Sequence, residues 1–422
     1  MLTPLKNKKL LILGGNSLSL DIVKQANKMG IYTIVTDWNS TKDSPAKLYA
    51  NEYWDISLLD YSTLAHKIQA EGIDGVITGF TDSYLLPYHH LCEICNLPCY
   101  GTKEQFELTL NKDLFKQKCR EYDVPTVPEY NIDTFNSASI SPQNKIILKP
   151  VDNSGSRGIC ICKSPNEFQK KLAYAQSFSA KKQVIIEEYM DCDDVSFEYK
   201  IQNGEVFLSA ICDRDIYKTS EFGSITSKLT YPSKYINSYL HDVNSKVINM
   251  FQGMKLQNGT DYTVVYADNV RIAFVKENQF YFYEMGYRLS GGRHYIFTEN
   301  QNQTNACKEL IQFALDGNMS HDKLSKKANP AFKDLCIQLS IICKSETINR
   351  IEGWEYVQGL KEVIDATTYF AEGDTIGQQG TTASIFARLH LVCKDSKRYD
   401  EILNDIKSHL RVYNAQNANI II

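Results

Sequence analysis

The sequence predicts a protein of mixed α/β and α+β class, and two observations lead to that prediction. Residues 1–102 alternate strand-like apolar runs with helix-like amphipathic segments, which is typical of a doubly wound parallel sheet. Residues 103–315 change to strands joined by polar hairpins, and a lysine-rich segment then leads into 316–422, where strand and helix return. We therefore expect three structural units with these limits.

The first unit is expected to contain three strands and two helices, each bounded by turn residues. In chain order these are KLLILGG, LSLDIVKQANKMG, YTIVTD, LAHKIQAEG and GVITGF. Ser17 is the expected N-cap of the first helix, and Gly30 closes it. Asp37 ends the second strand where a dinucleotide-binding fold keeps its ribose-binding acid, but GGNSLS lacks the third glycine of that fingerprint. We favour a tight turn and a capped strand end over NAD binding.

Composition excludes several classes of partner. Charged residues make up 23% of the chain, the formal net charge is -4 and there is no basic run, so we expect no nucleic-acid binding. The apolar stretch Leu10 to Leu13 is too short for a signal-peptide core, so we expect a cytoplasmic protein without a membrane segment. Twelve cysteines in such a chain are expected to be reduced thiols.

One cluster of cysteine and histidine residues invites a zinc interpretation. His89, His90, Cys92, Cys95 and Cys99 lie close together, but no second ligand pair follows at structural-zinc spacing. Cys92 and Cys95 are spaced i, i+3, as on the buried face of a helix. We favour the helix.

The first candidate for nucleotide chemistry is the stretch IILKPVDNSGSRGICIC. It predicts a strand ending in Lys149, a loop of small residues, and another strand. Backbone N–H groups of such a loop can bind phosphate oxygens, with Lys149 and Arg157 supplying positive charge. It is not a Walker A loop, and taken alone a hairpin turn is as good an interpretation. The small loop residues before Arg157 are Ser154, Gly155 and Ser156.

A second candidate is the acidic stretch that follows the apolar strand in QVIIEEYMDCDDVSFEY. A chain leaving such a strand at Glu187 and Glu188 can present backbone groups to an adenine edge, and a nearby carboxylate can accept from ribose hydroxyls. Asp193 and Asp194 are the nearby carboxylates. A solvated acidic loop is the alternative if the motif stands alone.

The third candidate is Glu284, at the end of FYFYE, a run with no polar face. A buried carboxylate needs a metal ion, Arg288, or a cation on a neighbouring strand. If Glu277 and Asn278 centre the preceding hairpin, Arg271 faces Glu284. A one-residue bulge would turn Arg271 away, and the missing metal ligand would then be sought at Asp261 or Asp268.

The order of these motifs resembles the ATP-grasp superfamily. The motifs are Lys112 in NKDLFKQKC, Lys149 with its loop, EEYM, and a strand ending E-x-x-x-R. The chain is most similar to the carboxylate-amine ligase branch, which includes glycinamide ribonucleotide synthetase, biotin carboxylase, carbamoyl-phosphate synthetase and amino-acid ligases. This resemblance covers nearly the whole chain. It implies a pre-ATP-grasp domain over 1–102, an ATP-grasp domain over 103–315 with a mobile lid at about 145–212, and a carboxylase-like closing domain over 316–422.

The resemblance also implies roles for individual residues. Lys112 and Lys149 would contact the ATP phosphates, and residues 154–158 would close over them. Glu284 would bridge two magnesium ions, and Arg288 would steady the transferring phosphoryl group. The family pattern is E-x-N-x-R, whereas this chain has Gly286 in place of the asparagine. The remaining implied contacts are the adenine hinge Glu187, Glu188, Tyr189 and Met190, the ribose carboxylate Asp194 in preference to Glu198, and the substrate residues Asp213, Lys218, Arg293 and His294.

The activity implied is ATP-dependent ligation. A substrate carboxylate is phosphorylated to an acyl phosphate, and an amine displaces phosphate to form an amide or peptide-like bond. We expect ATP and Mg²⁺ as cofactors, a small-molecule carboxylate and amine as substrates, and allow for a homodimer. The alternative is a nucleotide-binding scaffold with weakened or lost catalysis, suggested by Gly286 and Arg271.

Overall fold

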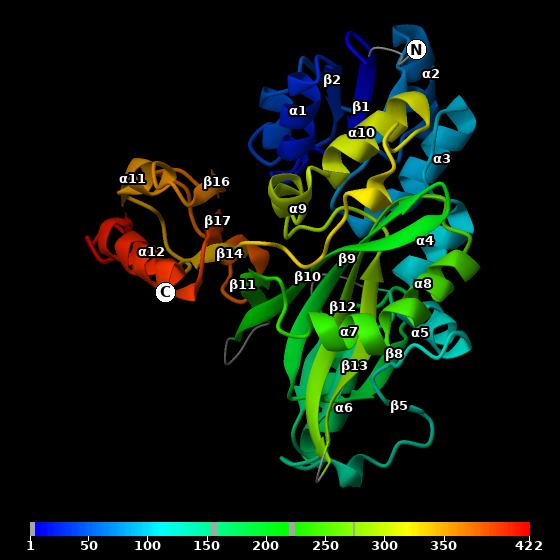
Figure 1. The fold of residues 1–422 in the computed structure, drawn as a ribbon, viewed down its shortest axis with the longest axis vertical. Helices are drawn as coiled ribbons and strands as arrows, with labels where there is room; N and C mark the ends of the chain where they lie inside the picture. Colours follow the sequence, from blue (N-terminus) through cyan, green and yellow to red (C-terminus); the bar gives the residue numbers. More distant parts are fainter. Residues whose placement is uncertain (1–4, 153–157, 219–223, 273–274) are drawn as a thin grey trace.

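The computed structural model describes residues 5–152, 158–218, 224–272 and 275–422. An N-terminal parallel sheet lies at one end of the molecule, a small sheet lies at the other, and an eight-stranded sheet lies between them. The C-terminal residues project to the side of this large sheet (Figure 1). The mixed α/β and α+β class predicted from the sequence is confirmed.

The N-terminal unit is a parallel sheet of strand order β3-β2-β1-β4, as the alternation of segments predicts. Its core is strand β1, where Leu10, Leu11 and Ile12 are fully buried. The short edge strand β3 was not predicted. The elements are β1 (Lys9–Leu13), α1 (Ser19–Lys28), β2 (Tyr32–Thr36), β3 (Glu52–Trp54), α2 (Tyr61–Glu71), β4 (Gly75–Ile77) and α3 (Leu85–Cys95), followed by α4 (Lys103–Leu110) and α5 (Lys112–Glu121).

Hydrogen bonds around the turn between β1 and α1 test two predictions, the N-cap of the first helix and the capped end of the second strand. The Asn16 side-chain oxygen accepts from the backbone N–H groups of Leu18 (3.0 Å) and Ser19 (3.1 Å). The predicted N-cap Ser17 is therefore wrong, because the adjacent asparagine binds the free N–H groups at the start of α1. The carboxylate of Asp37 accepts from the N–H of Gly15 (2.8 Å), so the strand end is capped as predicted.

The small sheet is antiparallel, with strand order β5-β8-β6-β7, and helix α6 covers it. It extends from 129 to 188, whereas the lid was predicted at about 145–212. The limits differ because the strand from Asp193 onward pairs with β10 and β12 of the large sheet. The elements are β5 (Glu129–Tyr130), β6 (Ile146–Pro150), β7 (Cys160–Cys162), α6 (Phe168–Ser177) and β8 (Val184–Glu188).

The large sheet is antiparallel, with strand order β13-β12-β9-β10-β11-β14-β17-β16. One face is apolar and packs on helices: the ring of Phe197 lies 3.9 Å from that of Tyr239 and stacks on it. The opposite face carries Asp194, Ser196 and Glu198, because side chains alternate along a strand. The elements are β9 (Asp193–Gln202), β10 (Glu205–Lys218), β11 (Ser224–Tyr231), α7 (Ile236–Asp242), α8 (Asn244–Gly253), β12 (Asn258–Ile272) and β13 (Val275–Gly286).

The register of the β12–β13 hairpin decides what lies beside Glu284. Arg271 pairs with Lys276, and Glu284 pairs with Val264, with a bulge between Val264 and Val265. The predicted pairing of Arg271 with Glu284 is wrong, because the strands pair up to Ile272 and Val275 and the bulge shifts the register again.

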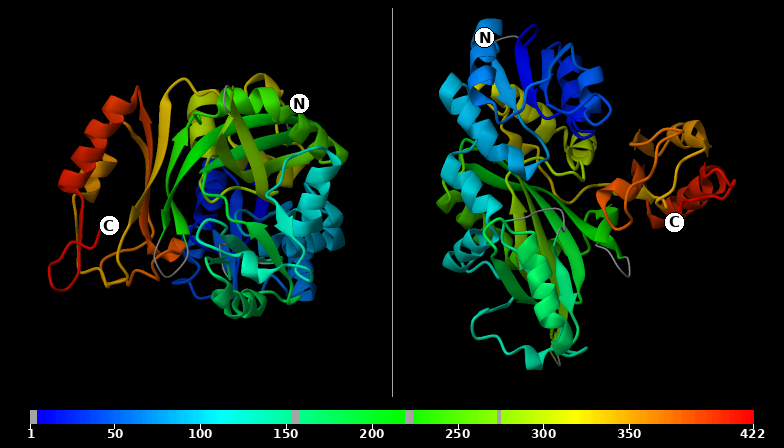
Figure 2. Two further views of the ribbon diagram at one scale, coloured as in Figure 1. Left: turned by 90° about the horizontal axis from the view of Figure 1, so that it is seen from below. Right: turned by 180° about the vertical axis from the view of Figure 1, so that it is seen from behind.

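Three strands of the C-terminal residues continue the large sheet, and two short ones, β15 (Arg350–Glu352) and β18 (Arg411–Tyr413), form a separate two-stranded sheet. Strand β14 pairs with β11, and β17 and β16 follow (Figure 2). The remaining elements are α9 (Tyr295–Asn302), α10 (Ala306–Asp316), β14 (Leu335–Ile342), β15 (Arg350–Glu352), α11 (Trp354–Gln358), β16 (Val363–Thr368), β17 (Ile385–Cys393), α12 (Ser396–His409) and β18 (Arg411–Tyr413).

Helix α10 belongs spatially to the N-terminal unit, although it lies within the predicted range 103–315. It contacts α1 and β4, and Lys8 donates to the carbonyl of Leu315 (2.6 Å). A Cβ added to Gly75 would lie 2.1 Å from the carbonyl oxygen of Ala314, so this contact needs glycine. Across the described ranges, the helices are all too short or too polar to cross a membrane.

Candidate active site

The candidate site lies where the small sheet meets the polar face of the large sheet. Lys149, on strand β6, is 4% exposed, and its Nζ lies 4.9 Å from the ring centre of Tyr283 on β13. An ammonium over an aromatic face is attracted by the negative potential of the ring. This contact therefore joins the two sheets at the residue predicted to bind phosphate.

Glu187 is buried between two lysines. Its carboxylate lies 2.6 Å from Nζ of Lys149 and also contacts Nζ of Lys116, a buried residue of helix α5. Burial by itself would raise the pKa of Glu187, but the two ammonium groups hold it below its ordinary value. Glu187 is therefore ionised, and its carboxylate is fully engaged by the protein.

Lys116 was missed by the sequence reasoning, which considered only Lys112, four residues earlier. Nζ of Lys116 also lies 2.6 Å from the carboxylate of Glu129. The available signal was its position: Lys116 lies beside Phe115 on the buried face of an amphipathic helix, where a lysine needs a buried acid. Lys112 is the first residue of α5 and is partly buried.

The chain after Glu187 leaves the small sheet as a short connector. The N–H of Glu188 donates to Pro128 (3.0 Å), and the N–H of Tyr189 donates to Lys145 (3.1 Å). The N–H of Met190 has no acceptor in the described part of the chain, so it is available to an adenine nitrogen. Lys218 donates to the hydroxyl of Tyr189 (3.3 Å), which brings one predicted substrate residue beside the predicted hinge.

Asp194 lies in a network of three side chains. The Tyr283 hydroxyl donates to it (2.8 Å), and the guanidinium of Arg214 lies 3.7 Å away. Arg214 in turn donates to the Tyr283 hydroxyl (3.1 Å) and to Thr226 (3.0 Å). The predicted ribose carboxylate therefore faces the same space as Lys149. Glu198, the second choice, is buried and bonded to Ser209, and burial raises its pKa to about 7.

Glu284 is partly buried, unlike the fully buried carboxylate that its flanking residues suggested. Within the described residues, no side chain donates a hydrogen bond to it. Arg288 lies close enough for the Glu284 charge to raise the pKa of the guanidinium further, after burial and Asp82 have had their larger effects. A partly exposed carboxylate without a donor is suited to a metal ion.

Arg288 is held by the N-terminal unit. Its Nε and Nη2 lie 2.5 and 2.7 Å from the two carboxylate oxygens of Asp82, and Nη1 donates to the carbonyl of Leu289 (3.0 Å). This two-point geometry fixes the plane of the guanidinium. Asp82 lies in the segment TGFTDS, at 78–83, which follows strand β4 of the N-terminal unit.

Asp213 and Arg293, two of the four predicted substrate residues, join different segments of the chain. Asp213 accepts from the hydroxyl of Ser233 (2.5 Å) and the N–H of Lys234 (3.2 Å), which anchors the segment after β11. Arg293 lies 2.5 Å from Asp21 of the N-terminal unit and 2.7 Å from Asp365 of β16. A substrate at Arg293 would have to displace one of these carboxylates.

His294 is fully buried. Its Nδ1 lies 2.5 Å from the Tyr231 hydroxyl, and burial together with the neighbouring Arg214 and His390 lowers its pKa to about 3. The imidazole is therefore neutral and cannot bind a carboxylate as a cation.

Four predicted phosphate-binding residues, Ser154, Gly155, Ser156 and Arg157, lie outside the described residues. Among the side chains that are described, no group of three or more His, Cys, Asp or Glu could hold a metal ion. Cys92 and Cys95 lie on helix α3, as favoured above.

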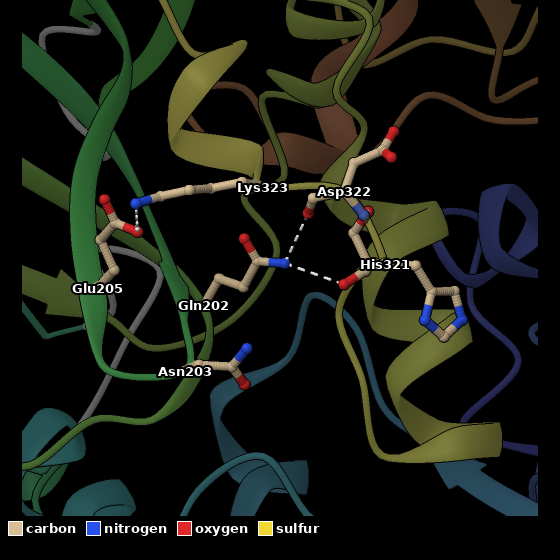
Figure 3. A pocket seen from close by; sticks show the side chains of 7 residues that line it. Gln202, Asn203, Glu205, His321, Asp322 and Lys323 are labelled. Carbon is tan, nitrogen blue, oxygen red and sulfur yellow. Dashed lines mark hydrogen bonds and ion pairs between the residues drawn. The ribbon is translucent and has the colours of Figure 1, made fainter.

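A separate surface hollow of about 270 Å³ contains none of these residues (Figure 3). It lies where the β9–β10 turn meets the segment at 320–323. Gln202 donates there to the carbonyls of Ser320 (3.0 Å) and Asp322 (2.9 Å), and Lys323 pairs with Glu205 (3.1 Å). These contacts tie two chain segments together.

The comparisons with known proteins identify an ATP-grasp domain within this fold. Residues 143–275 match the family model described as an ATP-grasp domain. The chain therefore contains an ATP-grasp domain, and the resemblance noted in the sequence is confirmed.

Curated relatives match about half of the chain. The chain is 28% identical over 209 residues to formate-dependent phosphoribosylglycinamide formyltransferase of Francisella tularensis subsp. tularensis, covering 45% of this chain and 50% of the relative. The enzyme of the same name from Pseudomonas savastanoi pv. phaseolicola is 26% identical over 191 residues, covering 44% and 48%. The matches thus span about half the length of these curated relatives.

Solved structures match over nearly the whole chain. The L-amino acid ligase from Bacillus licheniformis has a TM-score of 0.77 at 15% identity, covering 97% of this chain and 99% of that one. The phosphoribosylglycinamide synthetase from Anaerococcus prevotii has a TM-score of 0.74 at 17% identity, covering 97% and 100%. At these identities the likeness concerns the fold.

Proposed function

We propose that this protein is an ADP-forming ligase that joins a small-molecule carboxylate to an amine. The observation that carries the proposal is the convergence on one face of the large sheet of Lys149, Asp194, Glu284 and Arg288, which come from both sheets. The names of similar proteins support it, because an L-amino acid ligase and a phosphoribosylglycinamide synthetase share the fold over 97% of this chain.

The nucleotide is proposed to lie between the two sheets. Lys149 and Lys112 would bind its phosphates, and the N–H of Met190 would bind the adenine. Asp194 would accept from the ribose after exchanging its bond with Tyr283. Support comes from the biotin carboxylase domain of Hydrogenobacter thermophilus 2-oxoglutarate carboxylase, a dimer in complex with MgADP and bicarbonate, which has a TM-score of 0.74 at 17% identity, covering 96% of this chain and 91% of that one.

Glu284 fits a magnesium ligand, because its carboxylate is partly exposed and no side chain in the described ranges donates to it. When bound, magnesium neutralises phosphate oxygens. The protein itself would supply positive charge at fixed positions. Arg288, whose guanidinium plane is fixed by Asp82, would stabilise the transferring phosphoryl group. Lys149 would stabilise the developing charge on the leaving ADP.

The chemistry balances in two steps. An oxygen of the substrate carboxylate attacks the γ-phosphorus, the bond to the bridging oxygen breaks, and ADP leaves. The amine nitrogen then attacks the acyl carbon, phosphate leaves with the electron pair of the C–O bond, and the amine loses one proton. Neither step needs a side-chain nucleophile.

The acceptor is proposed to lie between the large sheet and the N-terminal unit, near Asp82 and the loop at 290–294. The predicted substrate residues Asp213, Lys218, Arg293 and His294 remain candidates, although Arg293 would have to give up a carboxylate partner to bind substrate. The cytoplasmic location and the homodimer remain predictions.

The test is ADP release from ATP with pooled carboxylates and pooled amines, each omitted in turn. We expect release that needs both pools, and with hydroxylamine in place of the amine we expect a hydroxamate, because hydroxylamine captures an acyl phosphate. Nucleotide binding without turnover under every pool would reject the ligase and favour the nucleotide-binding scaffold.

A further inference from the structure

The space above Gly286 is occupied by a cation. A Cβ built on Gly286 would lie 3.7 Å from Cζ and 3.8 Å from Nε and Nη2 of Arg288. The guanidinium therefore lies where the asparagine side chain of the E-x-N-x-R pattern would project. Glycine at this position leaves room for that placement.

This guanidinium is fixed and permanently charged. Asp82 binds two of its nitrogens and Leu289 a third, and only 13% of the side chain is exposed. Burial disfavours the charge, but the nearby carboxylates outweigh burial and raise the pKa of Arg288 above its ordinary value. The fixed positive charge is bound by Asp82 and interacts electrostatically with Glu284.

Among the described side chains of strand β12, none that faces Glu284 offers a ligand for a second metal ion. The residue opposite Glu284 is Val264, which is buried and apolar. Asp261 pairs with Tyr199, so its side chain belongs to the helix-covered face, and it accepts from Thr263. Asp268 pairs with Gln279, and so lies well along the hairpin from Glu284. Asp261 and Asp268 were the alternatives considered from the sequence.

We propose that this site holds a single divalent cation, on Glu284, and that the guanidinium of Arg288 over Gly286 takes the place of the second. The inference deepens the proposed ligase function and rests on it. One fixed guanidinium in a partly dehydrated site supplies positive charge to phosphate oxygens without a second set of ligands. The bidentate bond from Asp82 keeps that charge in position.

The test counts metal ions bound with nucleotide. Mn²⁺ is titrated into the full chain at saturating non-hydrolysable ATP analogue, and free Mn²⁺ is measured by electron paramagnetic resonance. We expect one Mn²⁺ per nucleotide bound to this protein, and its loss in Glu284→Gln. We expect two in the double variant Val264→Glu with Gly286→Asn, which supplies a carboxylate opposite Glu284 and displaces the guanidinium.

Val264→Met with Gly286 intact is the matched control, since it changes volume without adding a ligand, and it should keep one Mn²⁺. Two Mn²⁺ per nucleotide on the unsubstituted protein would overturn this inference and leave the ligase proposal standing. Failure to bind the nucleotide analogue at all would reject the proposed function and the inference with it. The number of Mn²⁺ ions bound per nucleotide by the unsubstituted protein distinguishes one metal site from two even if the double variant does not fold.

Discussion

The Nζ of Lys149 lies 2.6 Å from the carboxylate of Glu187, on the neighbouring strand of the small sheet, and both side chains are buried. The ammonium faces the Tyr283 ring of the other sheet at the same time. The residue proposed to bind phosphate is thus positioned by a carboxylate that was expected, from resemblance, to belong to the adenine hinge.

Removing that carboxylate should destabilise the small sheet. Glu187→Gln leaves the buried ammonium groups of Lys149 and Lys116 short of a counter-charge, and breaking a buried pair in this way costs about 3–5 kcal/mol. The loss in the free energy of unfolding is measured by urea denaturation at pH 7. Glu188→Gln, on the next and partly exposed residue, is the control and should change the free energy of unfolding little. Equal effects would contradict the structural role given to Glu187.

Replacing Lys149 should weaken ATP binding but not adenosine binding. Lys149→Met removes a charged hydrogen-bond donor to phosphate, worth about 1.5–3 kcal/mol, or roughly 10- to 100-fold in affinity. Calorimetry with an ATP analogue and with adenosine separates the two effects. The control is Lys170→Met, an exposed lysine on α6 of the same subdomain. A matched loss for adenosine would show that the substitution damaged the fold instead.

Asp261 should make stability depend on pH. Burial raises its pKa to about 7, so the folded protein keeps a proton that the unfolded chain releases near its ordinary value of 3.8. The stability tied to this group is therefore present at low pH and is lost as pH rises through about 7. Asp261→Asn mimics the protonated side chain and lacks this loss.

Relative to the unsubstituted protein, Asp261→Asn should gain up to about 1.4 kcal/mol of stability per pH unit between roughly pH 4 and 7, and then level off. The measurement is urea unfolding of both proteins at pH 5, 6, 7 and 8. Comparison with a variant is needed because the pKa of His294 shifts in the opposite direction. It is lowered to about 3, so the stability tied to His294 increases as pH rises. Asp133→Asn, at an exposed position, serves as control and should give a constant difference.

Arg293 should hold the N-terminal and C-terminal units together. Its guanidinium, 6% exposed, binds Asp21 and Asp365. Arg293→Met removes the guanidinium shared by the two carboxylates, at a cost of about 3–5 kcal/mol, and should speed amide hydrogen exchange in α1 and β16. Arg398→Met, which removes a solvent-screened guanidinium paired with Glu362, is the control and should change the free energy of unfolding little. Unchanged exchange in α1 would refute the link.

Local patterns determined the elements and the family. The 3.6-residue and two-residue periodicities gave the strands and helices of the N-terminal unit, since each depends on which neighbours in sequence share a face. The order of Lys149, EEYM and E-x-x-x-R was enough to indicate ATP-grasp, because those motifs lie at strand ends that the fold brings together. The sequence showed that Gly286 departs from the E-x-N-x-R pattern. It did not show that the Arg288 guanidinium lies over this glycine.

Contacts distant in sequence were decided only by the tertiary structure. Ile272 already pairs with Val275, so counting from a turn at 277–278 paired Arg271 with Glu284 wrongly. A bulge between Val264 and Val265 then shifts the register by one more residue. The partners of Glu187, Arg288 and Arg293 come from other units of the fold. Burying a charge requires a partner, but nothing in the local sequence says which distant residue supplies it.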